Sequence, residues 1–282
     1  MQYHVDGELV PANEATVSVR DRGFMYGDAA FETLRAYSGR IFEWRAHAER
    51  LARTSETMGL DHGLADADLR ERVRETLAAN DLEDAYVKLS ISRGVQPGKL
   101  SPDPAADPTV VVYAADLPRS RAFSNDCASV PFPDAAVPAR AKTHNYLNGI
   151  RARLELREGD GTDASTDEAL MLDANGNLAE GATSNLFFVR DGVLHTPSRD
   201  GPILPGITRR VVLELADEAG VPTETGAYEP AALREADEGF LTNSTWEIRP
   251  LATVDDARLG GGEITDRLAA AFDARVEREC YA

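Results

Sequence analysis

The sequence predicts an α+β fold of two domains, and three observations support this prediction. Segments with alternating apolar residues, typical of strands, are interspersed with segments of helical apolar spacing. A length of 282 residues suits one large domain or two modest ones. Residues 116–122, with Pro118 and two arginines, interrupt the pattern as a linker would. We therefore expect a smaller N-terminal domain over residues 1–115, a linker over 116–122 and a larger C-terminal domain over 123–282.

Turn residues and apolar spacing define the elements of the N-terminal half. Asp6-Gly7 and Ser38-Gly39 are typical hairpin turns. Apolar residues at helical spacing follow from Trp44, and Gly59 ends this pattern. The predicted elements are hairpins over 3–10 and 29–42, helices over 44–58 and 66–79, strands over 85–92 and 109–115, and a Pro/Gly-rich loop over 96–108.

The C-terminal half mixes the same two patterns. Asp191-Gly192 predicts a hairpin between two apolar strands, and residues 173–176 predict a turn. The predicted strands cover 126–132, 169–172, 185–190, 193–196 and 239–242, and the predicted helices cover 143–158, 208–219, 230–235 and 264–280.

Composition excludes several classes of partner. The formal net charge of -18 and the pI of about 4.7 argue against binding to nucleic acid or anionic membranes, because both need a basic face. The same acidic composition, with very few lysines, suits a halophilic protein in a high-salt cytoplasm. No segment resembles a signal peptide or reaches the roughly 20 apolar residues of a membrane helix. Cys127 and Cys280 form no disulfide framework. We expect a cytoplasmic protein.

Familiar catalytic motifs are missing from the sequence. It contains no HExxH, GxSxG, Walker-type phosphate loop or GxGxxG. The five histidines lack metal-ligand spacing, so no metal site is predicted. These absences disfavour zinc hydrolases, serine hydrolases and dinucleotide enzymes.

Lys142 is the candidate for covalent amine chemistry. The chain has three lysines, Lys88, Lys99 and Lys142, and arginine cannot replace lysine as an amine nucleophile because it stays protonated. Lys142 follows a Pro-rich loop in the middle of the chain and opens a helical pattern. The other two lysines have less distinctive surroundings.

Two segments are candidates for phosphate binding. Gly206-Ile207-Thr208 begins a predicted helix, where unpaired N–H groups converge on an anion, although it could be an ordinary helix start. His47 and Arg50 share one face of the first long helix, and a guanidinium matches phosphate well. The alternative for Arg50 is a solvated side chain.

Two further segments are candidates for polar contacts to a ligand. Glu180 lies beside Gly181, just before an apolar strand, where it could hydrogen-bond a ring nitrogen or be an exposed loop acid. Residues 242–245 concentrate small polar side chains after a strand, and could bind an anion or form a polar turn.

The order of these segments resembles the class IV aminotransferase family, the fold-type IV pyridoxal phosphate enzymes. The resemblance extends from about residue 3 to about residue 255. Its carriers are Tyr26-Gly27-Asp28-Ala29-Ala30-Phe31-Glu32-Thr33-Leu34-Arg35 and the segments 47–51, 142–147, 180–185, 206–209 and 242–247.

The resemblance implies a two-domain enzyme with pyridoxal 5'-phosphate between the domains, and a homodimer. Lys142 matches the Schiff-base lysine, which also moves protons. Glu180 matches the acid that keeps the pyridine nitrogen protonated. Arg50, Ile207, Thr208 and Ser244 match the phosphate cup. Tyr146 matches the residue near the ring oxygen, and the backbone of Thr245 would face the substrate carboxylate.

The resemblance is greatest to aminodeoxychorismate lyases, which release pyruvate to leave 4-aminobenzoate for folate biosynthesis. Three segments favour the lyase: Phe31-Glu32-Thr33, Lys142-Thr143-His144-Asn145-Tyr146-Leu147-Asn148 and Thr242-Asn243-Ser244. In lyases the hydroxyl at the Thr33 position is expected to assist proton transfer. Branched-chain aminotransferases usually have glycine at that position. Arg35 and Arg93 are candidates for substrate carboxylates or for strand-end salt bridges.

Several alternatives remain open at the level of sequence. The chain could be an aminotransferase for branched-chain L-amino acids or for D-amino acids, or a non-catalytic homologue. Tyr146 departs from the arginine of some lyases and the leucine of D-amino acid aminotransferases. His144 has no assigned counterpart.

Overall fold

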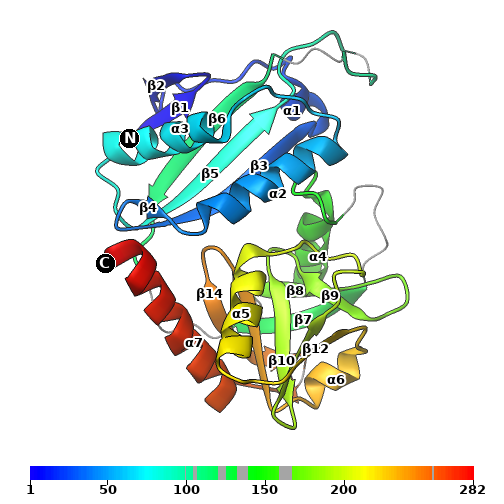
Figure 1. Ribbon diagram of the computed structural model, residues 1–282. Helices are drawn as coiled ribbons and strands as arrows, with labels where there is room; N and C mark the ends of the chain where they lie inside the picture. Colours follow the sequence, from blue (N-terminus) through cyan, green and yellow to red (C-terminus); the bar gives the residue numbers. More distant parts are fainter. Residues whose placement is uncertain (99, 104–106, 120–124, 132–138, 159–166, 256) are drawn as a thin grey trace. The chain divides into compact units, whose positions relative to one another are not determined.

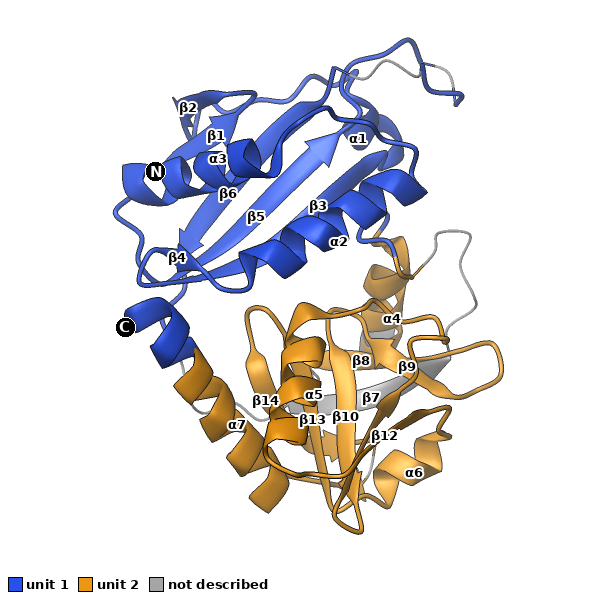
Figure 2. Ribbon diagram, viewed as in Figure 1, with its two compact units in different colours: residues 1–119, 141–145, 276–282 blue, residues 120–140, 146–275 orange. Residues whose placement is uncertain are grey.

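The protein forms two compact units in a computed structural model (Figure 2). The structure describes residues 1–98, 100–103, 107–119, 125–131, 139–158, 167–255 and 257–282. Unit 1 contains residues 1–119, 141–145 and 276–282, and unit 2 contains residues 120–140 and 146–275. These units differ from the predicted domains, because the segment with Lys142 and the last seven residues both belong to unit 1. Of the predicted linker, Asp116 ends a strand and residues 120–122 lie outside the described part.

Unit 1 is built on an antiparallel sheet whose described strands follow the order β2-β1-β6-β5-β3-β4. Helices α2 and α3 pack on one face of this sheet (Figure 1). The strands are β1 (Gln2–Val5), β2 (Glu8–Pro11), β3 (Ala29–Tyr37), β4 (Arg40–Ile41), β5 (Ala85–Ser92) and β6 (Thr109–Asp116). The helices are α1 (Arg22–Tyr26), α2 (Trp44–Thr57) and α3 (Asp66–Ala79).

Strand β3 divides its side chains between the two faces of the sheet. Ala30, Leu34 and Ala36 face the helices and join the apolar core of unit 1, as the period of two along a strand requires. Glu32 lies on this face too. The opposite face of β3 carries Phe31, Thr33, Arg35 and Tyr37, and Thr33 pairs directly with Lys88 on β5.

Residues 141–145 lie beside β3 as a non-helical segment, so the prediction that a helix begins at residue 143 was wrong. The N–H of Phe31 donates to the carbonyl of Lys142 at 3.0 Å, and the N–H of His144 donates to the carbonyl of Ala29 at 3.0 Å. Helix α4 begins only at Leu147. Pairing with a distant strand overrides the local helical pattern, and β-branched Thr143 is well suited to it.

Unit 2 contains a mixed sheet whose described strands follow the order β12-β11-β10-β13-β14-β7-β8-β9, with β15 paired to β14. Buried leucines and Phe188 form an apolar core on this sheet. The strands are β7 (Asn125–Pro131), β8 (Glu168–Leu172), β9 (Leu178–Gly181), β10 (Asn185–Arg190), β11 (Val193–Pro197), β12 (Thr223–Gly226), β13 (Glu238–Asn243), β14 (Glu247–Val254) and β15 (Ala257–Arg258). The helices are α4 (Leu147–Glu158), α5 (Ile207–Glu218), α6 (Pro230–Arg234) and α7 (Glu263–Val276), which continues as a π-helix over Glu277–Tyr281.

Five short or polar elements were not predicted from the sequence: α1, β9, β12, β14 and β15. Strand β12 is polar and mostly exposed, and β14 contains Pro250, so neither shows an apolar alternation. Their pairing with neighbouring strands stabilises them instead. Within the described residues, no helix is both long and apolar enough to cross a membrane.

Candidate active site

In unit 1, Arg50 and His47 on α2 bind the same buried carboxylate, that of Glu32 on β3. The guanidinium of Arg50 donates from Nε to Oε1 at 2.8 Å and from Nη2 to Oε2 at 2.5 Å. The Nδ1 atom of His47 lies 2.7 Å from Oε2. All three residues are at most 3% exposed. The predicted shared face of His47 and Arg50 is therefore confirmed, and the solvated alternative for Arg50 is excluded.

Within this cluster, Glu32 and Arg50 are charged and His47 is neutral. Burial alone would raise the pKa of Glu32, but the charge and hydrogen bonds of Arg50, with help from His47, lower it to about 2. Burial lowers the pKa of His47, so its ring is neutral at pH 7 and donates its Nδ1–H to Glu32. The planar guanidinium of Arg50 is consequently fixed in a defined orientation.

Lys142 lies against the other face of the sheet, beside Phe31. Its Nζ atom is 4.5 Å from the centroid of the Phe31 ring, and Nζ of Lys88 is 4.7 Å from the same centroid. Burial lowers the pKa of Lys88, and the nearby charge of Lys142 lowers it further. Sequence reasoning missed Lys88, because its place opposite Thr33 depends on the register of β3 with β5.

His144 adds a neutral polar group to this face. Its Nε2 atom lies 3.0 Å from Oγ of Ser90, and its ring contacts Phe31 edge to face. Burial, followed by the charge of Lys88, lowers the pKa of His144 to about 4. The ring is therefore uncharged at neutral pH, and one of its nitrogens donates a hydrogen bond while the other accepts one.

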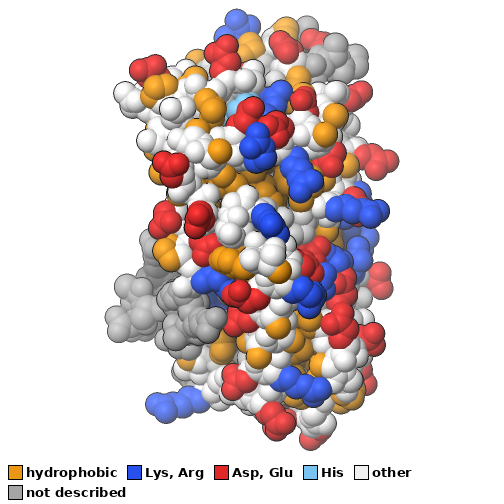
Figure 3. All heavy atoms as spheres, turned by 60° about the vertical axis from the view of Figure 1, so that its left-hand side comes forward, with side chains coloured by type: hydrophobic (Ala, Val, Ile, Leu, Met, Phe, Trp, Pro, Cys, Tyr) orange, Lys and Arg blue, Asp and Glu red, His pale blue; other side chains and the backbone are white. Residues whose placement is uncertain are grey.

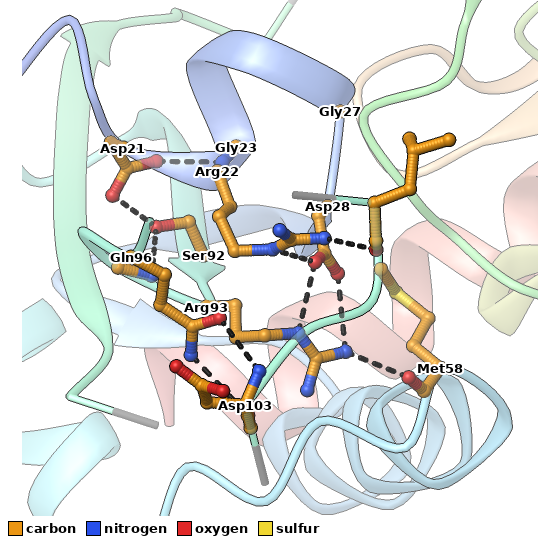
Figure 4. A network of polar contacts seen from close by, with 12 residues as sticks. Asp21, Arg22, Gly23, Gly27, Asp28, Met58, Ser92, Arg93, Gln96 and Asp103 are labelled. Carbon is orange, nitrogen blue, oxygen red and sulfur yellow. Dashed lines mark hydrogen bonds and ion pairs between the residues drawn. The ribbon is translucent and has the colours of Figure 1, made fainter. Parts of the chain in front are cut away.

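Arg35 and Arg93 differ in how their guanidinium groups are engaged. In the described part of the chain, Nε and Nη1 of Arg35 are buried without a hydrogen-bond partner, and the guanidinium lies 5.0 Å from the centroid of the Tyr37 ring. Arg93 instead donates to both carboxylate oxygens of Asp28 and to the carbonyl of Met58 (Figure 4). It also donates to the carbonyl of Gly59. The geometry thus supports the structural alternative for Arg93 and leaves Arg35 as a candidate for an anion.

In unit 2, the carboxylate of Glu180 on β9 is held from two sides. Its Oε2 atom accepts hydrogen bonds from Nδ2 of Asn185 at 3.1 Å and from the N–H of Leu204 at 2.9 Å. Glu180 is only partly exposed, which excludes the alternative of an exposed loop acid. Asn185 also comes so close to Gly206 that a Cβ atom there would lie 1.9 Å from its Oδ1. Glu180 is thus linked through Asn185 to the start of α5.

The start of α5 offers backbone donors for an anion. Gly206 is the N-cap, and it provides no side chain to satisfy the first N–H groups. Ile207 and Thr208 follow and are 6% and 5% exposed. Arg209 is buried with its Nη2 on the carbonyl of Pro197 at 2.9 Å, so its side chain braces this end of the helix.

The turn after β13 is organised by Asn243. Its Oδ1 atom accepts hydrogen bonds from the N–H and hydroxyl of Thr245, both at 3.0 Å, and from the N–H of Trp246 at 2.8 Å. The N–H of Thr245 is therefore used inside the turn, which does not support the predicted contact of this group with a substrate carboxylate. Ser244 and Tyr146 are partly exposed residues of the same unit.

Known proteins are similar to this sequence over nearly its whole length. Residues 29–254 match the family model for class IV aminotransferases. A putative branched-chain-amino-acid aminotransferase of Methanocaldococcus jannaschii is 36% identical over 96% of this chain and 95% of its own. An aminodeoxychorismate lyase of Bacillus subtilis is 32% identical, covering 97% and 94%. A D-alanine aminotransferase of Listeria monocytogenes is 29% identical, covering 99% and 98%.

Solved structures agree with these relatives. A branched-chain aminotransferase from Thermoproteus uzoniensis has a TM-score of 0.90 at 32% identity, covering 98% of this chain and 94% of its own. A T.th. branched-chain aminotransferase with pyridoxamine 5'-phosphate has a TM-score of 0.89 at 28% identity, covering 98% and 93%. The fold is that of the fold-type IV enzymes. The relatives of similar sequence are aminotransferases and a lyase, which sets aside a non-catalytic homologue. The chain belongs to the class IV aminotransferase family and is an enzyme whose cofactor is pyridoxal 5'-phosphate.

Proposed function

We propose that this enzyme is an aminodeoxychorismate lyase, which removes pyruvate from 4-amino-4-deoxychorismate and leaves the folate precursor 4-aminobenzoate. The observation that carries this proposal is the position of Thr33. Its side chain lies on the face of β3 that also presents Phe31, whose ring contacts the amine of Lys142, and Thr33 pairs directly with Lys88 on β5. A hydroxyl there can hold or move a proton close to the amine of Lys142.

Each unit, taken by itself, has residues that suit a part of the cofactor. In unit 2, the oriented carboxylate of Glu180 suits a protonated ring nitrogen, and the N–H groups at Ile207 and Thr208, with Ser244, suit a phosphate. Arg50 adds a fixed cation for the phosphate, Lys142 the attaching amine and Tyr146 a hydroxyl near the ring. Pyridoxal 5'-phosphate supplies an electron sink for the carbanion formed at the substrate.

The cations beside Thr33 suit a substrate with two carboxylates. Lys88 lies directly across from Thr33, and Arg35 follows on the same face of β3 with two unpaired nitrogens. The guanidinium of Arg93, a predicted candidate for a substrate carboxylate, is already occupied by Asp28 and two carbonyls. We therefore propose that Lys88 binds this carboxylate instead. A dicarboxylate such as 4-amino-4-deoxychorismate would neutralise both cations.

The second candidate is an aminotransferase for branched-chain L-amino acids or D-amino acids with 2-oxoglutarate. It is favoured by the relative of 36% identity and by the TM-score of 0.90 to a branched-chain aminotransferase. Lys88 and Arg35 would also suit 2-oxoglutarate, which is a dicarboxylate. Thr33 is thus the residue that separates the two candidates.

Analysis of the reaction products distinguishes the lyase from the aminotransferase. The enzyme loaded with cofactor is incubated with 4-amino-4-deoxychorismate, and separately with L-leucine or D-alanine plus 2-oxoglutarate. Pyruvate and 4-aminobenzoate formed without a keto acid support the lyase, whereas turnover of the amino acids alone refutes it. Thr33→Val should slow the lyase at least about 100-fold, the usual contribution of one acid–base group, while Thr33→Ser keeps most of the rate. Equal rates for Thr33→Val and wild type would remove Thr33 from the reaction.

We also propose a homodimer, which exposed apolar side chains around α1 support. Val19 and Phe24 are each 72% exposed, and Leu100 is 80% exposed. The carbonyl of Leu100 is bound by Arg22 of α1, so these side chains belong to one region of unit 1. Sedimentation should give twice the chain mass, and Phe24→Asp should shift it towards the monomer, whereas a monomeric wild type would contradict the proposal.

A further inference from the structure

The backbone of Lys142 is held from two directions inside unit 1. Its carbonyl accepts from the N–H of Phe31 at 3.0 Å, which joins it to the sheet. Its own N–H donates to Oγ1 of Thr54 at 3.2 Å, which joins it to helix α2. Thr54 is 1% exposed, so its side chain is shielded from water.

Thr54 uses its hydroxyl differently from the other two threonines in the helices of unit 1. The hydroxyls of Thr57 and Thr76 donate to carbonyls four residues earlier in their own helices, at 2.8 Å and 2.7 Å. That arrangement is usual for threonine inside a helix. The oxygen of Thr54 instead accepts from a residue 88 positions further along the chain. Its hydroxyl therefore connects two segments rather than closing a turn.

The hydrogen bond between Thr54 and Lys142 also relates Lys142 to Arg50. Thr54 follows Arg50 by four positions on α2, so both side chains lie on one helix face, which is buried against the sheet. Arg50 is fixed in turn by its two hydrogen bonds to Glu32. The hydroxyl of Thr54 thus sets the position of the Lys142 backbone relative to the cation proposed for the cofactor phosphate.

The segment with Lys142 needs such a contact because its pairing with β3 is short. The bridge between Ala30 and Thr143 is a single antiparallel bridge outside the named strands. After this bridge along the chain, Nδ2 of Asn145 donates to the carbonyl of Gly27 at 3.0 Å. Before the bridge, at Lys142, the segment is held by the hydrogen bond to Thr54.

We propose that Thr54 is a positioning residue for Lys142, its hydroxyl fixing the backbone from which the reactive amine extends. This proposal rests on the proposed role of Lys142 as the amine that attaches the cofactor. Small errors of position matter for such a group, because a displacement of about 1 Å can cost about 100-fold in rate.

Hydrogen exchange of the protein without cofactor tests the contact itself. The amide of Lys142 is followed in wild type and in Thr54→Val, which replaces the hydroxyl by a methyl group of similar size. Exchange should be about fivefold faster in Thr54→Val, as expected for the loss of one ordinary hydrogen bond. Thr54→Ser keeps the acceptor and should exchange like wild type. Thr57→Val, a matched change on the same helix, should also leave Lys142 unchanged.

The rate of cofactor attachment tests whether the contact with Thr54 affects the reactivity of Lys142. Pyridoxal 5'-phosphate is added to each protein, and the growth of its protein-bound visible absorbance is timed. The rate constant should fall about tenfold in Thr54→Val and remain near wild type in Thr54→Ser and Thr57→Val. If Thr54→Val does not fold, Thr54→Ala removes the hydroxyl without a new methyl contact and is measured in the same way.

The outcomes separate this proposal from the proposed function. Unchanged exchange in Thr54→Val overturns the proposal, and so does faster exchange with an unchanged attachment rate. A wild type that takes up no pyridoxal 5'-phosphate would remove Lys142 from its proposed role, which defeats the proposed function and the positioning role together. The exchange measurement would still report whether Thr54 holds the segment.

Discussion

Glu32 keeps its charge inside unit 1 because Arg50 and His47 share its two oxygens. Glu32→Ala would leave the buried guanidinium of Arg50 without this anion, which should destabilise the protein by about 3–5 kcal/mol. Urea unfolding measures the change. Glu83→Gln serves as a control, because Glu83 is exposed and its loss should change stability by no more than about 0.5 kcal/mol. Similar values for the two variants would show that the cluster does not contribute to stability.

The same carboxylate makes stability depend on pH in the acid range. The pKa of Glu32 is about 2 in the folded protein and near 4.5 when unfolded, so the folded state favours the ionised form. Its contribution is therefore present above pH 4.5 and is lost as the pH falls from about 4.5 to about 2. Glu32→Gln should flatten the stability curve in this window. An unchanged slope between pH 4.5 and pH 2 would contradict the assignment.

His144 should act in a higher pH window. Its pKa falls from 6.5 to about 4 on folding, so protonation favours the unfolded state. The stability that it contributes is present above pH 6.5 and is lost as the pH falls from 6.5 to about 4. Its ring signals in NMR should not titrate between about pH 8 and pH 5.5. A midpoint near 6.5 would mean that the ring is hydrated and free of Ser90.

Some residues of the candidate site could be predicted from the sequence, and others could not. Lys142 could be singled out because lysine is rare in this chain, and Arg50 because it follows His47 by one helical turn. The partner of both α2 residues, Glu32, could not be deduced, since it depends on how α2 packs on β3. Arg93 was a candidate ligand because nothing in the sequence shows that Asp28 and two carbonyls surround it.

At the scale of elements, long apolar segments were predictable and short connecting ones were not. The predicted strand over 85–92 coincides with β5, and the predicted helix over 66–79 coincides with α3. Residues 143–146 were assigned to a helix because they continue the pattern of α4. The hydrogen bonds of Lys142 and His144 to β3 decide otherwise, and no local pattern reports a partner more than a hundred residues away.

Gly27 connects α1 with the segment 141–145, and its replacement should disturb both. It ends α1 with φ of 67°, and a Cβ there would lie 2.6 Å from Oδ1 of Asn145. Gly27→Ala should therefore lower stability more than backbone strain alone would, and it should speed amide exchange in residues 141–145. Gly39→Ala isolates the strain, because Gly39 has φ of 72° and a Cβ added there would meet nothing within 4 Å. Equal losses in the two variants would show that the contact with Asn145 does not matter.

At the scale of the whole molecule, the division into units does not follow the order of the chain. Unit 1 draws on three separate segments, including the C-terminal residues 276–282. The hydroxyl of Tyr281 donates to Asp84 at 2.6 Å, and Arg119 pairs with Glu277 at 3.0 Å. A boundary placed after residue 115 from composition alone could not include these segments, because their membership arises from contacts between distant residues.

Net charge is the remaining property of the whole molecule, and it predicts a response to salt. Acidic residues number 48 against 30 basic ones, and Figure 3 shows acidic side chains spread over much of one face among basic ones. Repulsion among them falls as salt shortens the screening length from about 10 Å at 0.1 M to about 3 Å at 1 M. The thermal midpoint should therefore rise with KCl concentration, as proposed for a halophilic protein.

A variant with less charge provides the comparison for this salt response. Glu8, Glu14 and Glu83 are exposed, and their joint change to glutamine lowers the net negative charge by three. Because the repulsion grows with net charge, the triple variant should be more stable than wild type at low salt and gain less from added KCl. Differential scanning calorimetry at several KCl concentrations measures both effects. A wild-type midpoint that is constant or falls with KCl would show that repulsion between surface acids does not limit the stability of this fold.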